Sequence, residues 1–359
     1  MDCRSVFPHA FCDPFGLARD AAYGALTSVL PEWLATLLLV FLGVFLVINV
    51  VPLIVMGQIY LERRIIARAQ DRIGPNRVGP FGLLQPVADG IKLLAKEDIM
   101  PLRADQVMFT IAPILVLAAS LMVWAVVPFG PGLGVTDINV AVLYIVAAAA
   151  LPTIGFIMAG WSSYNKYALF GGMRAVAQFI SYEIPGILAL ITPVLLAGSM
   201  SLQDIVQAQS GYRWFIFYPV IGQIAFFLFL TSALAETNRT PFDLVEAESE
   251  LGAGFHTEYS GMRFALFFLA EYANMFSVSL IAAALFLGGW EFPLLPPFIV
   301  MIAKAQALVF VLMWIRATLP RLRYDQLMNF AWKRLLPLSL VNVGLTSVGA
   351  ALLRGMVRL

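Results

Sequence analysis

Long uninterrupted runs of apolar residues recur along this chain, and they restrict it to a membrane fold. A helix needs roughly 20 apolar residues to cross the hydrocarbon layer of a bilayer. Runs of that kind cover residues 33–58, 108–127, 140–159, 175–197, 214–234, 264–287, 298–315 and 335–353. Only 13% of the residues are charged, whereas soluble domains carry about a quarter. The sequence predicts an all-α polytopic integral membrane protein with about eight transmembrane helices.

Lysine and arginine gather in the connections that follow the odd-numbered spans. Such connections stay on the cytoplasmic or matrix side of a membrane, so both termini are expected to face outward. Residues 1–30 carry Asp2, Asp13 and Asp20 and lack the basic start and apolar centre of a signal peptide. We expect them to form a polar extension on the outer side, followed by a single transmembrane domain over 31–359.

The inner connections are expected to carry the function. The outer ones, 128–139 and 288–297, are short and rich in Gly and Pro, which suits turns. The predicted inner loops span 62–105, 236–263 and 316–334. In the first of them, residues 83–96 show the spacing of an amphipathic helix lying at the membrane surface. Its arginines also fit simple positive-inside anchoring. Glu62 beside Arg63, at the mouth of a span, fits anchoring less well.

Several classes of function are disfavoured by what the chain lacks. Its cysteines are Cys3 and Cys12 and its histidines are His9 and His256. These cannot supply paired histidines to a haem or four cysteines to an iron–sulfur cluster, and no metal site is expected. The balance of 23 basic and 22 acidic residues argues against nucleic acid as a partner. Any redox cofactor is expected in partner subunits, and whether the two cysteines form a disulfide stays open.

The third inner loop and the span after it are crowded with acidic residues, with Arg239 and Arg263 as the bases among them. The acidic residues are Glu236, Asp243, Glu246, Glu248, Glu250, Glu258 and Glu271. Ionised carboxylates at 246, 248 and 250 repel one another, so some of them should titrate near neutral pH. A solvated acidic loop is the alternative for any single residue. The flanking spans, however, hold the whole group against the membrane.

Three charged residues lie at membrane depth. Glu183 follows Arg174 by nine residues and Glu271 follows Met262 by nine, which is roughly 13 Å of helix from the inner ends of two predicted spans. Lys304 precedes Arg316 by twelve residues, roughly 18 Å, and is a candidate partner for one of these carboxylates. Ionisable groups at this depth mark ion or proton paths by default. A structural buried ion pair is the alternative.

The inner-loop motifs resemble one family closely. They comprise Glu62-Arg63-Arg64, the strings at 74–80 and 84–89, the string Ala235-Glu236-Thr237-Asn238-Arg239-Thr240-Pro241-Phe242-Asp243-Leu244, the acidic string 246–251, Ala270-Glu271-Tyr272, and the string 316–328. Together they are similar to the H subunit of proton-translocating NADH:quinone oxidoreductase, respiratory complex I. The resemblance covers about residues 31–355. The N-terminal extension is longer than is usual in that family and inherits no role.

The resemblance implies a role for each matching residue. The quinone chamber would be bordered by Glu62, Arg63, Phe242, Glu246, Glu248, Glu250 and Arg316. A proton-coupling path would contain Glu183, Glu236, Asp243, Glu258 and Glu271, and Lys304 is added to it on its membrane depth. The chain alone would hold no catalytic residue and no redox centre.

The resemblance also implies the surroundings of the chain. Quinone, expected to be ubiquinone, would be the substrate, with FMN and iron–sulfur clusters in partner subunits. The partners would be the peripheral-arm subunits at the quinone site, the antiporter-like membrane subunits and the lipid bilayer. The expected location is a bacterial inner membrane, with the mitochondrial inner membrane as the alternative.

Two other classes of function fit parts of the sequence. An ion-coupled secondary transporter would explain charged residues inside the membrane, but it predicts two similar halves. The acidic loop has no counterpart in the first half. A structural anchor for a peripheral complex would explain the large inner loops, but it leaves Glu183, Glu271 and Lys304 without a purpose.

Overall fold

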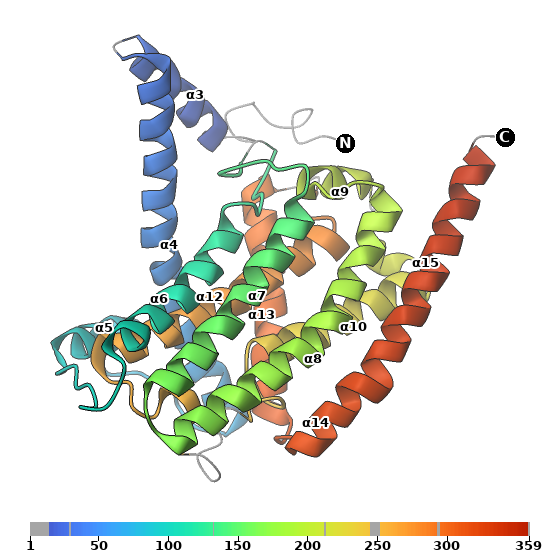
Figure 1. Cartoon of the computed structure of the whole chain (residues 1–359). Coiled ribbons are helices and arrows are strands. Elements are labelled where there is room, and N and C mark those ends of the chain that lie inside the picture. The colour runs from blue at the N-terminus through green and yellow to red at the C-terminus, as the bar shows by residue number, and fades with distance from the viewer. Residues whose placement is uncertain are drawn as a thin grey trace.

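The computed structural model describes residues 14–28, 30–131, 133–211, 213–244, 252–292 and 295–357, with the backbone alone for 14–19 and 352–357. Over these residues the fold is helical, and the only bridge of the β type joins Gly130 and Leu133. The α-helices are α3 (Pro14–Thr27), α4 (Glu32–Ala69), α5 (Gln85–Ala95), α6 (Gln106–Trp124), α7 (Ala141–Ser162), α8 (Lys166–Ala197), α9 (Leu202–Ala208), α10 (Ile221–Glu236), α12 (Gly261–Phe286), α13 (Pro297–Thr318), α14 (Tyr324–Phe330) and α15 (Leu336–Val357). Figure 1 shows their arrangement. The predicted all-α membrane fold is confirmed.

In the described part of the chain, seven helices are long and apolar enough to cross a membrane. They are α4, α6, α7, α8, α12, α13 and the continuous run through α14 and α15, where residues 331–335 form a π-helical segment. Apart from the fifth, the predicted spans overlap these helices along most of their length, although α4 runs on through Glu62 to Ala69 and α8 begins nine residues before the predicted start at 175. The inner ends of these helices therefore project beyond the apolar runs.

The fifth predicted span differs from the expectation. The sequence predicts a helix from residue 214, but α10 begins at Ile221 and has 16 residues. At 1.5 Å per residue it is about 24 Å long, which is less than the hydrocarbon thickness. Pro219 and Val220, with φ of 68° at Val220, interrupt the backbone before it. The apolar run at 214–220 is therefore a short 3₁₀ turn and a loop, not helix.

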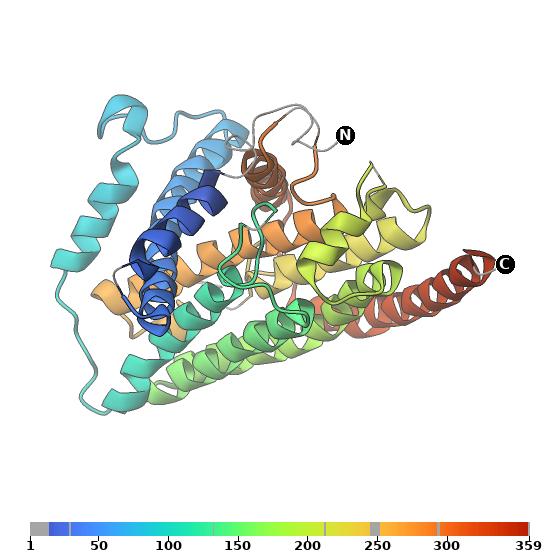
Figure 2. The same ribbon diagram turned by 90° about the horizontal axis from the view of Figure 1, so that it is seen from above.

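The centre of the bundle is α12, the most buried of the long helices. Around it pack α4, α6, α8, α10 and α13, while α7 lies against α6 and α8 (Figure 2). Small residues bring α7 and α8 together: a Cβ on Gly160 would lie 2.8 Å from the carbonyl oxygen of Ala168, and one on Gly172 would lie 2.9 Å from that of Phe156. Close approach at small residues is the usual way in which membrane helices associate.

Helix α4 has two unlike halves separated by Pro52. The outer half exposes its apolar side chains, while the inner half buries Val51, Val55, Gln58, Glu62 and Ala67. Gln58 also exchanges hydrogen bonds with Gln306 of α13, at 2.7 and 3.2 Å. The inner half is thereby fixed against α12 and α13, and it carries Glu62 into the protein interior.

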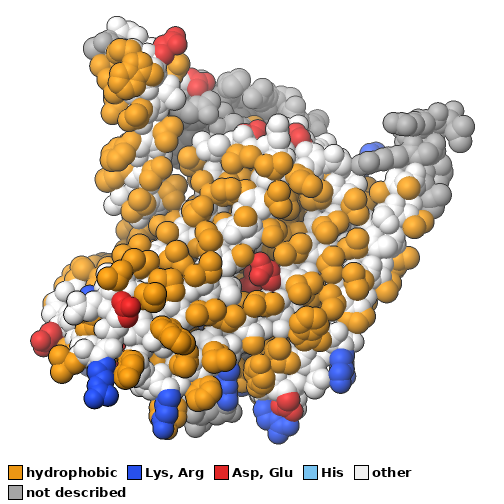
Figure 3. Space-filling view, viewed as in Figure 1, with side chains coloured by type: hydrophobic (Ala, Val, Ile, Leu, Met, Phe, Trp, Pro, Cys, Tyr) orange, Lys and Arg blue, Asp and Glu red, His pale blue; other side chains and the backbone are white. Residues whose placement is uncertain are grey.

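The two faces of the membrane differ in charge in the structure as in the sequence. Helix α3 and the C-terminal end of α15 lie at the same end of the molecule (Figure 1), which fits eight crossings when the shorter helix α10 is counted with the seven longer ones. On the face drawn in Figure 3, Lys and Arg side chains gather at the opposite end of the molecule, and an apolar band lies between the two ends. Acidic atoms also appear in the middle of that band. The part of the predicted extension that the structure describes is a helix, α3.

Candidate functional site

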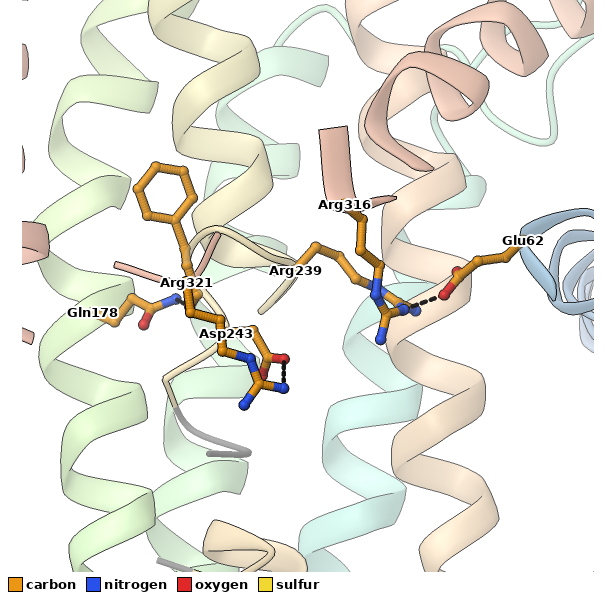
Figure 4. A network of polar contacts seen from close by, with 7 residues as sticks. Glu62, Gln178, Arg239, Asp243, Arg316 and Arg321 are labelled. Atoms are coloured by element: carbon orange, nitrogen blue, oxygen red, sulfur yellow. Dashed lines mark hydrogen bonds and ion pairs between the residues drawn. The ribbon is translucent and has the colours of Figure 1, made fainter. Parts of the chain in front are cut away.

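A buried carboxylate with two arginines forms the centre of the inner face. Glu62, on α4, accepts hydrogen bonds on one oxygen from Nη1 of Arg239, at 3.2 Å, and from Nη1 of Arg316, at the C-terminal end of α13 (Figure 4). The side chains of Glu62 and Arg239 are 5% and 4% exposed, whereas Arg316 is 27% exposed. One negative charge therefore faces two positive charges at the inner end of the bundle, and the group carries a net positive charge.

The end of α10 places Arg239 in this group. The helix ends at Glu236, and Asn238 follows with φ of 48°, a left-handed conformation that asparagine tolerates better than most residues. Arg239 then lies 4.2 Å from the ring centre of Tyr272 on α12, as a cation over an aromatic face. Burial alone would lower the pKa of Arg239, but Tyr272 and Glu62 raise it above the ordinary value for arginine. The guanidinium therefore stays charged.

A second ion pair closes the segment that follows Arg239. Asp243 is buried and accepts a hydrogen bond from Nη2 of Arg321 at 2.8 Å (Figure 4), and the backbone N–H of Leu322 donates to the carbonyl of Pro241 at 3.0 Å. Phe242, the residue between Pro241 and Asp243, is buried, and the centre of its ring lies 5.1 Å from the centre of the Tyr182 ring. The loop after α10 is thus held to the segment between α13 and α14.

Not all of the residues predicted for the quinone chamber join this group. Arg63 instead pairs with Asp89 of α5 at 2.6 Å, in an ion pair whose side chains are 43% and 34% exposed. Residues Glu246, Glu248 and Glu250 lie outside the described residues. The structure therefore brings together Glu62 and Arg316, places Phe242 on the same loop as Arg239, and leaves Arg63 on the surface next to α5.

Three carboxyl-bearing residues from three helices line one cavity inside the bundle. They are Glu183 of α8, Glu236 at the end of α10 and Glu271 of α12. The space in the cavity, including the part that is open to its surroundings, is about 530 Å³, and Ser120, Thr153, Asn238 and Asn274 add further polar groups to its wall. Polar surroundings of this kind can hold ordered water, through which protons move. Glu183 lies near the middle of α8, and Glu271 lies in the half of α12 nearer to the inner end.

A second cavity, with about 510 Å³ of space when its open part is included, adjoins the first on its outer side. The two share Ala149, Glu183, Glu236 and Asn274, and each helix contributes residues further from the inner face to the second cavity than to the first. Apart from Ser232 and these shared polar groups, its wall is apolar, including Val123, Ile145, Leu190, Phe229, Val278 and Ile281. Glu183 and Glu236 therefore border both cavities, whereas Glu271 borders the first alone.

Glu258 lies at the inner surface, away from both cavity walls. It accepts a hydrogen bond from Nδ2 of Asn165, the residue that caps α8, at 2.6 Å. The next residue, Tyr259, stacks on Phe109 with ring centres 3.9 Å apart, and burial raises the pKa of its hydroxyl to about 12. Glu258 thus fixes the loop before α12 to the start of α8.

Lys304 occupies the outer part of the bundle. Its ammonium group donates hydrogen bonds to the carbonyl oxygens of Leu287, Gly289 and Glu291, at 2.6, 2.8 and 3.3 Å, and lies 4.4 Å from the ring centre of Trp214. These carbonyls follow the C-terminal end of α12, where a positive charge is favourable. The expected pairing of Lys304 with a mid-membrane carboxylate is therefore wrong, because Lys304 lies in the outer part of α13.

Sequence reasoning missed several residues of the two sites. Gln178, Asn238, Asn274 and Arg321 each contact a predicted site residue or line the carboxyl cavity, and Tyr272 contacts Arg239. From the sequence, Arg239 is only a base within the acidic loop. Neutral amides inside apolar spans are a usable signal, since each needs a buried hydrogen-bond partner. Among the described residues, no group of three or more His, Cys, Asp or Glu side chains is placed to hold a metal ion.

The fold and these two sites define an all-helical membrane protein with a charged inner face and carboxyl groups at membrane depth. Comparison with known proteins identifies the family. A family model described as NADH dehydrogenase matches residues 42–347. Over 289 residues, 80% of each chain, this chain is 53% identical to the H subunit of NADH-quinone oxidoreductase from Dehalococcoides mccartyi strain CBDB1.

Other relatives are similar over nearly their full length. The H subunit of NADH-quinone oxidoreductase from Geobacillus kaustophilus is 52% identical over 324 residues, 89% of this chain and 96% of the relative. The second of the numbered H subunits from Syntrophobacter fumaroxidans is 49% identical over 324 residues, 88% of this chain and 97% of the relative. The chain belongs to the family of NADH-quinone oxidoreductase H subunits, as the resemblance of its motifs implies.

Proposed function

We propose that this chain is a membrane subunit of an NADH:quinone oxidoreductase and couples quinone reduction to proton movement. The observation that carries the proposal is that Glu183, Glu236 and Glu271, from three helices, line one cavity inside the bundle. Carboxyl groups at this depth are costly unless they are protonated, paired or hydrated. Because they share one cavity, the charge of each affects the protonation of the others.

The Glu62 group is the proposed end of the quinone chamber. Arg239 and Arg316 converge on Glu62 with a net positive charge, which would favour a substrate that becomes negative when reduced. Arg63, Phe242 and the acidic residues 246, 248 and 250 are proposed to border the same chamber. The substrate is a quinone, with ubiquinone expected. A change of charge there would alter the pairing of Arg239 and Arg316 with Glu62.

The loop after α10 is proposed to carry that change inward. Asp243 lies on this loop and Glu236 at its start, while Glu258 fixes the adjoining loop to α8. Protonation and conformation of the carboxyl groups would then change in response to the quinone. The proposed role of Lys304 in this path is indirect: it holds the outer end of α12, the helix that carries Glu271 and Asn274.

The remaining parts of the reaction are assigned to partners. Electrons would arrive from FMN and iron–sulfur clusters in the peripheral-arm subunits, and protons would cross through the antiporter-like membrane subunits. The names of the relatives support assembly into such an enzyme, and the seven apolar helices support insertion in a bilayer. The proposed location is a bacterial inner membrane. Purification of the tagged chain in mild detergent tests the proposed assembly with partner subunits. Recovery of the chain alone, as a transporting protein, would contradict it.

Replacement of the cavity carboxyl groups tests the coupling role. In membranes that contain the assembled complex, Glu183→Gln and Glu271→Gln are expected to lower both quinone reduction and proton pumping. Each change removes a titratable proton while keeping the shape of the side chain. Glu97→Gln is the matched control, because Glu97 is an exposed residue of the first inner loop. Normal quinone reduction and pumping in both cavity variants would contradict the proposal.

A further inference from the structure

One short segment of the chain joins the two sites, in addition to the contact between Arg239 and Tyr272, the residue that follows Glu271 on α12. Among consecutive residues after α10, Asn238 lines the carboxyl cavity and Arg239 donates to Glu62. Glu236, two residues earlier than Asn238, belongs to the cavity, and Asp243, four residues after Arg239, is held by Arg321. A movement of the Arg239 backbone relative to Glu62 would therefore displace the adjoining backbone that carries Asn238 and Glu236.

A single neutral side chain fastens this segment to α8. Nε2 of Gln178 donates to the carbonyl oxygens of Ala235, at 2.8 Å, and Phe242, at 2.9 Å, and it lies 3.4 Å from Oδ1 of Asn238. Figure 4 shows Gln178 on the α8 side of the group. Gln178 is 1% exposed. The carbonyl of Ala235 belongs to the last turn of α10, where carbonyl groups have no partners within the helix. One amide group thus holds the start and the end of the loop at once.

Helix α8 strengthens this attachment one turn further on. The ring of Tyr182 packs on Phe242, and its hydroxyl donates to the carbonyl of Leu327 at 2.9 Å. Gln178 and Tyr182 are four residues apart and therefore lie on the same side of α8. The residue after Tyr182 is Glu183. A displacement of the loop thus acts on the part of α8 that carries the first cavity carboxyl group.

We infer that Gln178 is a positioning residue that transmits changes at the Glu62–Arg239–Arg316 group to the carboxyl cavity. The inference deepens the proposed function and rests on it. The amide suits this role because it carries no charge and keeps both donors at every physiological pH. It moves with the loop without taking part in the protonation changes. In its absence the loop shifts without displacing α8, and quinone reduction becomes separated from the proton path.

The test compares Gln178→Leu with Gln209→Leu in the assembled complex in membrane vesicles. Leucine keeps the bulk of glutamine and removes its donors. Gln209 is the matched control, because it is fully buried and binds the backbone of four residues at the outer end of the bundle, Ile205, Phe215, Ala284 and Gly288. Protons pumped per quinone reduced is the readout, with NADH oxidation by an artificial electron acceptor as the measure of assembly.

We expect the ratio of pumped protons to reduced quinone to fall about five-fold in Gln178→Leu, within the usual range of coupling between sites, and to stay at its wild-type value in Gln209→Leu. Gln178→Asn keeps the amide on a side chain that is one methylene shorter, and it is expected to give an intermediate ratio. This variant tests the inference if the leucine variant fails to assemble. A wild-type ratio in the Gln178 variants, or an equal loss in Gln209→Leu, overturns the inference. Normal pumping in Glu183→Gln would instead refute the proposed function.

Discussion

Replacement of Glu62 by glutamine is expected to destabilise the chain far more than the same change in an exposed ion pair. The side chains of Glu62 and Arg239 are 5% and 4% exposed, so Glu62→Gln leaves a buried guanidinium without this counter-charge. Breaking a buried pair in this way costs about 3–5 kcal/mol. The ring of Tyr272, 4.2 Å away, offsets part of that cost, which favours the lower end of the range.

The Arg63–Asp89 pair provides the control. Its atoms are only 2.6 Å apart, but its side chains are 43% and 34% exposed, and pairs of this kind contribute about 0–1 kcal/mol. Asp89→Asn makes the same chemical change as Glu62→Gln. From an unfolding entropy of about 2.1 cal/mol/K per residue, the midpoint of thermal disruption should fall by about 4–7 °C for Glu62→Gln and by about 1 °C or less for Asp89→Asn.

The assay heats the purified complex and follows the tagged chain on native gels, so that it reports release of the chain and not catalysis. The comparison depends on burial and not on distance, since the exposed Arg63–Asp89 pair has a shorter separation than the buried Arg239–Glu62 pair. Equal shifts in the two variants, or no shift in Glu62→Gln, would refute the reasoning that burial decides the strength of these pairs.

Three further substitutions test other parts of the structure. Gly171→Ala should destabilise the chain by about 1–3 kcal/mol, because its Cβ would lie 2.7 Å from the backbone of Gly254. The control Gly90→Ala on α5 meets nothing within 4 Å and should be neutral or mildly stabilising, and thermal release of the tagged chain measures both changes. Lys304→Met removes the hydrogen bonds to three carbonyl groups and should lower thermal stability by about 1–3 kcal/mol, while the ratio of pumped protons to reduced quinone stays normal. A changed ratio in a fully assembled complex would give Lys304 a direct part in proton transfer. Val278→Asp places a carboxyl group among the apolar residues of the outer cavity and should raise passive proton leakage of vesicles, relative to Val278→Ala. Equal leakage in the two variants would show that the apolar wall of this cavity does not block the passage of protons.

The membrane spans could be predicted because the length of an apolar run is a local property. The exception is the fifth span, where residues 214–220 are apolar but Pro219 and Val220 prevent helix, so composition and backbone geometry give different answers. The depth of Glu183 and Glu271 also followed from their distance to the ends of the spans. That they share a cavity with Glu236 depends on the packing of α8, α10 and α12, which no local pattern specifies.

The ion pairs show why partners are harder to predict than positions. Arg63 follows Glu62 in sequence, but neighbouring residues of a helix point in different directions. The actual partners of Glu62 are 177 and 254 residues away, on a loop and at the end of another helix. Lys304 was expected to pair with a carboxylate because charges of opposite sign attract. Carbonyl groups at the end of α12 lie closer to it and accept its hydrogen bonds instead.

The central claim is that the protonation of Glu183, Glu236 and Glu271 responds to the redox state of the quinone. Infrared difference spectroscopy of the assembled complex, recorded between the oxidised and reduced states, measures this directly through the C=O stretch of protonated carboxyl groups. We expect such a band in the wild type, reduced in amplitude in Glu183→Gln and Glu236→Gln and unchanged in Glu97→Gln. An identical band in all four proteins would contradict the account.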